Sequence, residues 1–184
     1  MTILRTHSRR MHSLVSLNDG SLALDEERAP FSPTMWTIPE TNKKTYLRQT
    51  WFTGVHQSVG GGDPSHGLSD ITLAWMMQQL TDRTDLEINV QYLLDSRKTF
   101  SPNQMYLPWG TEPWKPTYVG IYHVMGKKPR TPGKYPVNPG EKTNEFVHKS
   151  VLRRIELEGS SFEHPDISQL EEDKFGPLEQ QLSW

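Results

Sequence analysis

Cysteine is absent from the chain, and apolar residues are scarce in it. Without a thiol, the 184 residues can form no disulfide, thiolate metal site or cysteine nucleophile. Hydrophobic residues make up 34% of the chain, whereas typical globular domains contain roughly 45–50%. We therefore expect a core that is small for this length, in one domain or in one domain with a small annex.

Long apolar runs are also missing. The densest run, Ile71–Met77, is far shorter than the roughly 18–20 apolar residues of a membrane span. The apolar part of a secretory signal is absent, although Arg5, Arg9 and Arg10 precede the first acid, Asp19, and give the N-terminus a weak resemblance to a transit peptide. We therefore expect a cytoplasmic protein without a transmembrane segment.

Neither sign of charge dominates the composition. Lys and Arg number 20 and Asp and Glu number 22, so the net charge is −2. A nucleic-acid binder, or a protein held on membranes by charge alone, would be basic overall, and we expect no nucleic-acid partner. Lys127, Lys128, Arg130 and Lys134 form one local basic patch. This patch could contact phosphate, but a solvated loop is the favoured interpretation.

One strongly patterned unit stands out against this background. Residues 45–55 are rich in aromatic and β-branched residues and predict a strand that ends at Gly54. A glycine-rich loop follows, and Ser69 is then a candidate N-cap for a helix over 69–80. Apolar residues at helical spacing make this helix a buried one, packed against a sheet. A strand, a glycine-rich loop and a buried helix predict an α/β fold.

The remaining sequence is less clearly patterned. Residues 1–20 look irregular and end in the turn signal Asn-Asp-Gly. Residues 97–140 are rich in proline and aromatic residues and predict a long loop. The tail from residue 159 is polar and acidic, and we expect it to be flexible. Short helices are predicted over residues 21–29, 85–96 and 148–158.

His56 is the first candidate catalytic residue. It lies just beyond the carboxyl end of the predicted strand, where active-site groups of open α/β sheets are found. A histidine there can accept and return a proton near neutral pH. It can equally serve only to hydrogen-bond the backbone, and its position alone favours this second interpretation. His148 is a secondary candidate, although its place at a helix start suits a structural hydrogen bond better.

Gly60, Gly61 and Gly62 follow His56 closely. Their backbone N–H groups could bind an anion or a tetrahedral oxyanion. They could also form only a tight, loop-shaping turn, which is the favoured interpretation. They are no dinucleotide fingerprint, because Ser65 stands where G-x-G-x-x-G requires its third glycine.

Other catalytic patterns are missing. The G-x-S-x-G turn that presents the nucleophile of α/β hydrolases does not occur. Its nearest approach is Gly67–Ile71, in which the second glycine is lacking. The histidines after His56 show no metal-ligand spacing; they are His66, His123, His148 and His164. We therefore expect neither a metal nor a cofactor.

Three blocks of the sequence resemble the catalytic domain of type VI secretion phospholipase effectors, an α/β-hydrolase family with many fungal members. Residues 23–36 are similar to A-L-D-E-x-R-x-x-F-x-P-T-x-W. Residues 51–76 are similar to W-F-x-G-V-H-S-D-V-G-G-G-Y followed by L-x-D-I-x-L-x-W-M, and this long block is the most specific. Residues 130–151 are similar to the fungal-type R-T-P-G-x-Y and T-N-E-x-I-H-P-S-V. The resemblance spans roughly residues 22–152, and residues 1–20 show none.

The resemblance implies the C-terminal part of an α/β-hydrolase-type parallel sheet, with flanking helices and long Pro-rich loops, over residues 21–158. It implies a Ser-Asp-His triad that acts on lipid or other esters, with His56 at the position of the histidine. The serine and the acid would both lie upstream of these blocks. Gln57-Ser58 stands in place of the family's Ser-Asp pair, Asp63 in place of its Tyr, and Lys149 in place of its Pro.

Two functions follow as alternatives. The first is a fragment of a lipase- or esterase-like hydrolase that is inactive alone and has a lipid or ester as its substrate. The second is a non-catalytic interaction module that uses the aromatic, Pro-rich segment 100–136. A parallel sheet that has lost its upstream strands would also have a bare edge, through which we expect self-association.

Overall fold

The computed structural model describes residues 16–63, 66–92, 112–114, 120 and 122–182. Its centre is a sheet of four parallel strands in the order β1-β3-β5-β6. The strands are β1 (Ser16–Ala23), β3 (Thr45–Phe52), β5 (Glu145–His148) and β6 (Glu171–Asp173). A separate antiparallel pair joins β2 (Ile38–Pro39) to β4 (Glu141–Lys142). The α/β fold predicted from the sequence is confirmed.

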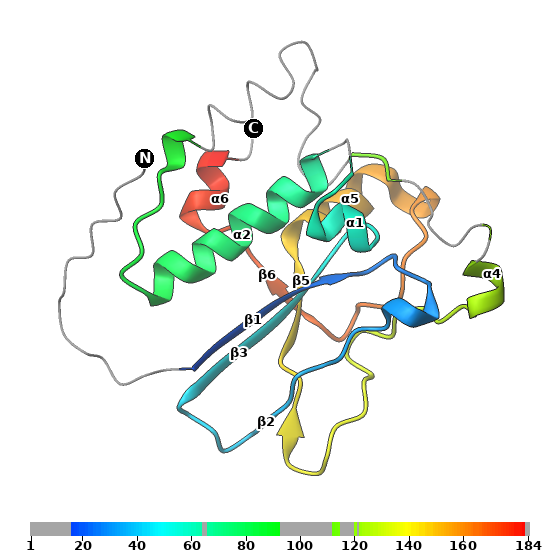
Figure 1. Ribbon diagram of the computed structural model, residues 1–184, viewed down its shortest axis with the longest axis horizontal. Coiled ribbons are helices and arrows are strands. Elements are labelled where there is room, and N and C mark those ends of the chain that lie inside the picture. Colours follow the sequence, from blue (N-terminus) through cyan, green and yellow to red (C-terminus); the bar gives the residue numbers. More distant parts are fainter. Residues whose placement is uncertain (1–15, 64–65, 93–111, 115–119, 121, 183–184) are drawn as a thin grey trace.

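Helices flank this sheet (Figure 1). They are α1 (His56–Gly60), α2 (Gly67–Arg83), α4 (Tyr122–Met125), α5 (Lys149–Glu158) and α6 (Pro177–Leu182), with short 3-10 turns η1 (Ala29–Phe31) and η2 (Gly159–Ser161). None of the helices in the described part of the chain is long and apolar enough to cross a membrane.

Two hydrophobic clusters form the core, and β3 contributes to both. Phe52 packs with Trp75 of α2 and Leu178 of α6 in one cluster. Trp51 packs with Val151 of α5 in the other. Because successive side chains of a strand point to opposite faces, these neighbouring aromatic residues place α2 and α5 on opposite sides of the sheet.

The strongly patterned unit folds as expected. The predicted strand is β3, and the predicted buried helix is α2, which is longer at both ends. Ser69 is not the N-cap, because the helix begins at Gly67, and the Ser69 hydroxyl donates to the carbonyl of His66 at 3.0 Å inside the first turn. The predicted helix over 148–158 is α5, which ends at Gly159 with a positive φ of 57°.

The prediction for the N-terminal region is wrong from residue 16 onward. The sequence pattern predicts irregular structure over residues 16–20 and a helix over residues 21–29, but Ser16–Ala23 is strand β1. It pairs with β3 in parallel along its whole length, from Ser16 opposite Thr45 to Ala23 opposite Phe52. Pairing with a strong neighbouring strand overrides the local turn preference of Asn-Asp-Gly.

The predicted helix over residues 85–96 is confirmed only over residues 90–92, because residues 85–89 are not helical. The rest of that prediction lies outside the described residues. The expected bare edge and the self-association through it stay predictions, since β1 pairs only with β3 among the strands described.

The C-terminal tail contains a strand and a helix that its polar, acidic composition does not predict, while its flexibility stays a prediction. Residues 171–173 form β6, which pairs with β5, and residues 177–182 form α6, which packs on α2. Two of the acids that make the tail look solvated, Asp173 and Glu179, are buried at 4% and 1% exposure. Buried carboxylates persist when hydrogen bonds satisfy them, and both of these are satisfied.

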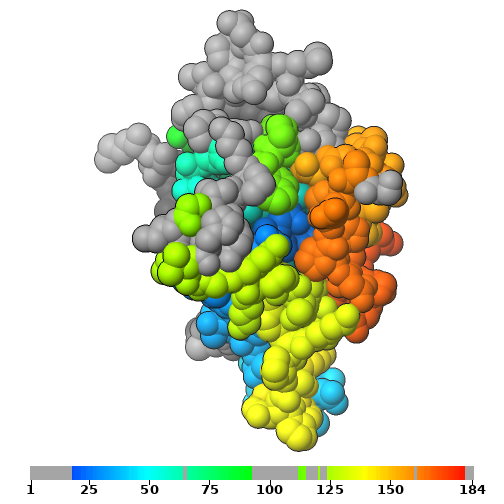
Figure 2. Space-filling model, turned by 90° about the vertical axis from the view of Figure 1, so that its right-hand side faces the viewer, coloured from blue at the N-terminus to red at the C-terminus, as the bar shows by residue number. Residues whose placement is uncertain are grey.

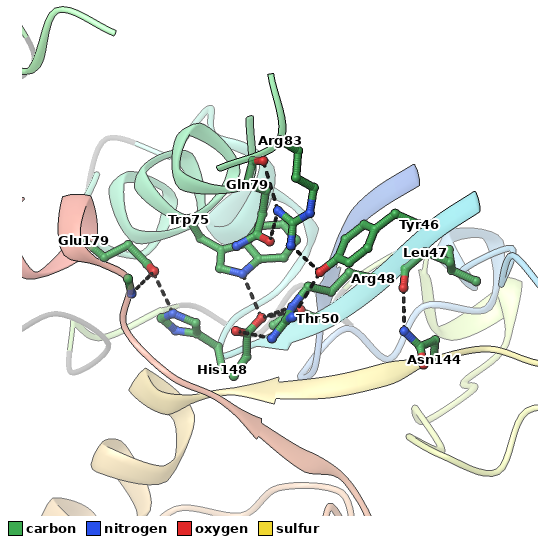
Figure 3. Close-up of polar contacts among 12 residues, drawn as sticks. Tyr46, Leu47, Arg48, Thr50, Trp75, Gln79, Arg83, Asn144, His148 and Glu179 are labelled. Atoms are coloured by element: carbon green, nitrogen blue, oxygen red, sulfur yellow. Dashed lines mark hydrogen bonds and ion pairs between the residues drawn. The ribbon is translucent and has the colours of Figure 1, made fainter. Parts of the chain in front are cut away.

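Asp173 is the centre of a cluster of polar side chains beneath α2. Its carboxylate accepts hydrogen bonds from the Arg48 guanidinium at 2.8 and 2.5 Å, from the Thr50 hydroxyl at 2.9 Å and from the Trp75 indole at 2.8 Å. The three donor side chains converge between α2 and β3 in Figure 3. The cluster therefore ties the last strand of the sheet to β3 and to α2.

Candidate active site at the carboxyl edge of the sheet

The carboxyl ends of β1 and β3 lie side by side, and the chain stays paired beyond them. The backbone N–H of Leu24 donates to the carbonyl of Phe52 at 2.9 Å, and that of Asp25 donates to Gly54 at 3.1 Å. Figure 2 looks onto this edge, where the blue segment after β1 lies at the floor of a hollow bordered by yellow-green and orange parts of the chain. The hollow is the candidate site.

His56 lies at this edge as the sequence predicts. It is the first residue of α1, and its side chain is exposed. Its backbone N–H donates to Glu26 Oε2 at 3.2 Å, which fixes the start of α1 against the segment after β1. The ring centroid lies 5.2 Å from that of Phe31, and no residue in the described ranges hydrogen-bonds the imidazole. The ring nitrogens are therefore open to a substrate or to another catalytic group.

Two carboxyl groups after β1 share this edge, and their environments differ. Asp25 Oδ2 accepts the backbone N–H of Gly54 at 2.6 Å, and burial raises the pKa of Asp25 to about 7. Burial would raise the pKa of Glu26 as well, but hydrogen bonds from Arg28 and from the His56 backbone lower it to about 2. At neutral pH, Glu26 is thus ionised, whereas Asp25 is close to half protonated.

Arg28 explains why Glu26 is a fixed anion. Its guanidinium donates to both Glu26 oxygens, at 2.9 and 2.7 Å, and the two side chains are almost fully buried. The same guanidinium lies over the Phe31 ring, 3.9 Å from its centroid. Phe31 in turn contacts the His56 ring. One continuous set of contacts therefore joins Glu26 to the candidate histidine.

Sequence reasoning missed Asp25 and Glu26 as site residues, because it assigned residues 21–29 to a helix. The available signal was a short run with Leu22 and Leu24, followed by two acids. A stronger strand comes later in the chain, with His56 just beyond its end. Two consecutive strands that run parallel bring their following residues to the same edge.

The three glycines after His56 do not share one backbone conformation. Gly60 closes α1 with an ordinary backbone conformation, while Gly61 and Gly62 have φ values of 91° and 106° that favour glycine. The N–H of Gly61 donates to the carbonyl of Gln57 at 2.9 Å and caps α1. This amide is therefore occupied within the loop, and the choice between the oxyanion role and the loop-shaping role of the three glycines stays a prediction.

His148 is placed in a wholly different environment. It is 0% exposed at the end of β5. Its Nδ1 lies 2.8 Å from Ser150 Oγ and accepts the Ser150 backbone N–H, so it caps α5. Its Nε2 lies 2.9 Å from Glu179 Oε1, as Figure 3 shows. The order serine, histidine, carboxylate is that of a catalytic triad, but all three groups are buried, and no substrate reaches them in this arrangement.

The basic patch is only partly a free surface. Lys127 pairs with Glu27 at 2.9 Å, Lys134 pairs with Asp166 at 3.0 Å, and Arg130 is buried. The proposed interaction segment spans residues 100–136, and most of its residues up to 121 lie outside the described part of the chain. The alternative of a non-catalytic interaction module therefore stays a prediction. In the described ranges, no three His, Asp or Glu side chains gather in a way that could hold a metal ion.

Residues 2–79 match the family model "T6SS, Phospholipase effector Tle1-like, catalytic domain". This confirms the resemblance for the part of the chain that carries β1, β3 and His56, and it indicates a family of lipase-like hydrolases. The match begins at residue 2, so the expectation that residues 1–20 are unrelated to the family is wrong. The third block of the resemblance, residues 130–151, lies beyond the match. No curated protein and no solved structure matches the chain.

Proposed function

We propose that the chain is the histidine-bearing part of a lipase-like serine hydrolase domain that acts on lipid or other ester bonds. The observation that carries the proposal is the position of His56. It stands in the family-matched block at the carboxyl edge of a parallel sheet, with an exposed imidazole. We propose further that the chain is inactive until a nucleophilic serine is supplied from outside these residues.

His56 would act as the general base and then as the general acid. Its exposed imidazole would take the proton of the serine hydroxyl as the oxygen attacks the ester carbonyl. The same proton would pass to the departing alcohol when the tetrahedral intermediate collapses. Water would then be activated in the same way to release the acyl group and restore the free serine.

Asp25 is the proposed orienting acid, which revises the expectation that this group lies upstream. The order acid then histidine along the chain is that of α/β hydrolases. Arg28 already binds both oxygens of Glu26, whereas Asp25 Oδ2 has the Gly54 N–H as its partner. An imidazolium beside Asp25 would favour the ionised carboxylate and lower its pKa from the raised value of the free site.

The serines of the described residues near His56 do not suit the nucleophile. Ser58 is 2% exposed, and Ser69 lies in the first turn of α2 with its hydroxyl bonded to the carbonyl of His66. Neither lies in G-x-S-x-G. We therefore expect the purified chain to release no burst of p-nitrophenol from a p-nitrophenyl ester. A burst that a serine-directed phosphonate abolishes would contradict this expectation.

Joining the chain to the serine-bearing part of a family member's catalytic domain tests the proposal directly. We expect the joined protein to hydrolyse phospholipid or p-nitrophenyl esters. The same protein should be inactive when the serine of its G-x-S-x-G turn is changed to Ala. A joined protein that folds cooperatively and binds the phosphonate, but turns over no ester, would argue for the non-catalytic alternative.

A further inference from the structure

The α4 turn carries the most exposed large apolar side chain of the described residues. Val124 is 87% exposed, and the adjacent Met125 is 50% exposed. Figure 1 shows α4 projecting from the rest of the molecule. Adjacent apolar side chains held out in water are unfavourable unless something covers them.

This turn is fixed to the candidate site by backbone hydrogen bonds. The N–H of Ala29 donates to the carbonyl of Gly126 at 3.1 Å, and the N–H of Lys128 donates to Glu27 at 2.7 Å. Between them, Arg28 and Lys127 form an antiparallel bridge. Since Phe31 of the same η1 segment contacts His56, the apolar turn stands on the edge of the sheet that carries the candidate histidine.

The charge beside the turn is positive. Three basic residues and no acid lie between Val124 and Thr131; they are Lys127, Lys128 and Arg130. Lys127 is offset by its ion pair with Glu27, and Arg130 is buried, but Lys128 is exposed, and no carboxylate of the described residues pairs with it. An apolar tip with a cation at its base is the pattern that anionic lipid surfaces attract.

Two other exposed apolar side chains, Leu157 and Val137, lack this pattern. Leu157 on α5 is 61% exposed, but acids flank it on both sides, at Glu156 and Glu158. Val137 is 43% exposed in the loop before β4, on a part of the chain that does not border His56. The combination of apolar tip, unpaired lysine and nearby candidate histidine is therefore specific to the α4 segment among these surfaces.

We propose that the α4 segment, defined as Val124, Met125 and Lys128, docks the protein on the surface of an anionic phospholipid bilayer. This inference rests on the proposed function, because it presents the His56 edge to a lipid substrate. Val124 and Met125 insert among the headgroups, and Lys128 pairs with their phosphates. The docking itself needs no chemistry at His56.

Vesicle flotation tests the proposal in a form that is independent of hydrolysis. The full chain is mixed with vesicles of ether-linked lipids, which have no ester to cleave, made of phosphatidylcholine alone or with phosphatidylglycerol. We expect flotation with the anionic vesicles, weakened as salt is raised. The double variant V124S/M125S should lower the partition coefficient about tenfold, and K128Q about fivefold. The matched control V137S should leave it unchanged.

Three results would overturn the proposal. The first is that the wild-type chain does not float with anionic vesicles, and the second is that V137S weakens binding as much as V124S/M125S does. The third is a dimer in sedimentation that V124S/M125S dissociates while vesicles are ignored, since the segment would then bind a second copy. Failure of the hydrolysis test with intact flotation would reject only the proposed function.

Discussion

His56 and His148 lie at or just beyond the carboxyl ends of neighbouring parallel strands, yet the structure gives them opposite surroundings. His56 has an exposed ring with no hydrogen bond from the described residues, and its backbone N–H is bonded to Glu26. His148 is enclosed, and both of its ring nitrogens have partners. A histidine at the carboxyl end of a strand is thus either available for chemistry or used to hold elements together, and accessibility decides between the two.

The surroundings of His148 are built from polar groups that hydrogen-bond to one another. His148 lies between Ser150 and Glu179, is stacked on Phe52 and meets the edge of Phe175. Because α6 supplies Glu179, this hydrogen bond fastens the end of the chain to the sheet. The open side has one buried acid with a raised pKa instead, which is a feature of sites that move protons.

Removing Asp173 should have the largest effect on stability. Asp173→Ala leaves the half-buried Arg48 without its carboxylate and breaks the bonds to the buried Thr50 and Trp75, so the free energy of unfolding should fall by about 3 kcal/mol. The exposed neighbour variant Glu171→Ala should stay within about 0.5 kcal/mol. Urea unfolding measures both. Equal effects of the two substitutions would show that the cluster is not a stabilising centre.

Substitution of the two histidines should separate them clearly. His148→Ala removes the cap of α5 and leaves Glu179 Oε1 buried without its partner, which should cost about 3 kcal/mol. His56→Ala should change the free energy of unfolding by less than about 0.5 kcal/mol, because its ring is exposed. The comparison fails if His56→Ala proves the more destabilising in urea unfolding.

Gly54 is the point at which the open edge cannot tolerate a side chain. Its φ is 111°, and an added Cβ would lie 2.8 Å from the Ser58 Cβ. Gly54→Ala should therefore lower the free energy of unfolding by about 2–3 kcal/mol. Gly60→Ala meets nothing within 4 Å and should be neutral or slightly stabilising. Thermal unfolding of the two variants side by side checks this contrast.

The acids of the open edge should have opposite pH signatures. The pKa of Asp25 is raised from 3.8 to about 7, so between these values the folded chain keeps a proton that the unfolded chain releases. Stability from this group is present at low pH and is lost as pH rises through 7. The contribution of Glu26, whose pKa is lowered to about 2, is present above its ordinary pKa and is lost only below pH 4.5.

Comparison of wild type with Asp25→Asn isolates the first of these signatures. Between pH 5 and pH 8 the wild type should lose roughly 2 kcal/mol more stability than Asp25→Asn, which cannot ionise at this position. Parallel curves for the two proteins across this range, measured by urea unfolding, would show that Asp25 titrates as an ordinary exposed acid.

The sequence predicted the strand-loop-helix unit because its apolar periodicity agrees with its tertiary packing. The aromatic residues Trp51 and Phe52 and the helix around Trp75 are local signals of burial. The same signals could not reveal β1, whose Asn-Asp-Gly favours a turn, nor β6, whose three acidic residues resemble a solvated tail. Both strands depend on partners distant in sequence, Thr45–Phe52 for β1 and Glu145–His148 for β6.

The candidate site followed the same rule. His56 could be predicted because its strand has a strong pattern, whereas Asp25 and Glu26 could be recognised only after β1 was known. A structural hydrogen bond was predicted for His148 from its place at the start of a helix, but its burial was not, and its partner Glu179 is 31 residues away in the sequence. Composition and local pattern carry no information about such a pairing.

The most direct test of the central claim is kcat/KM for ester hydrolysis by the joined protein that carries both the serine-bearing part and this chain. His56→Ala should lower kcat/KM by about a thousandfold or more, because the members of a triad act as a unit. His148→Asn, compared at equal amounts of folded protein, should lower it by less than about tenfold, since its role is structural. If His148→Asn abolished turnover while His56→Ala left it intact, the catalytic base would be His148, and the assignment of that role to His56 would be wrong.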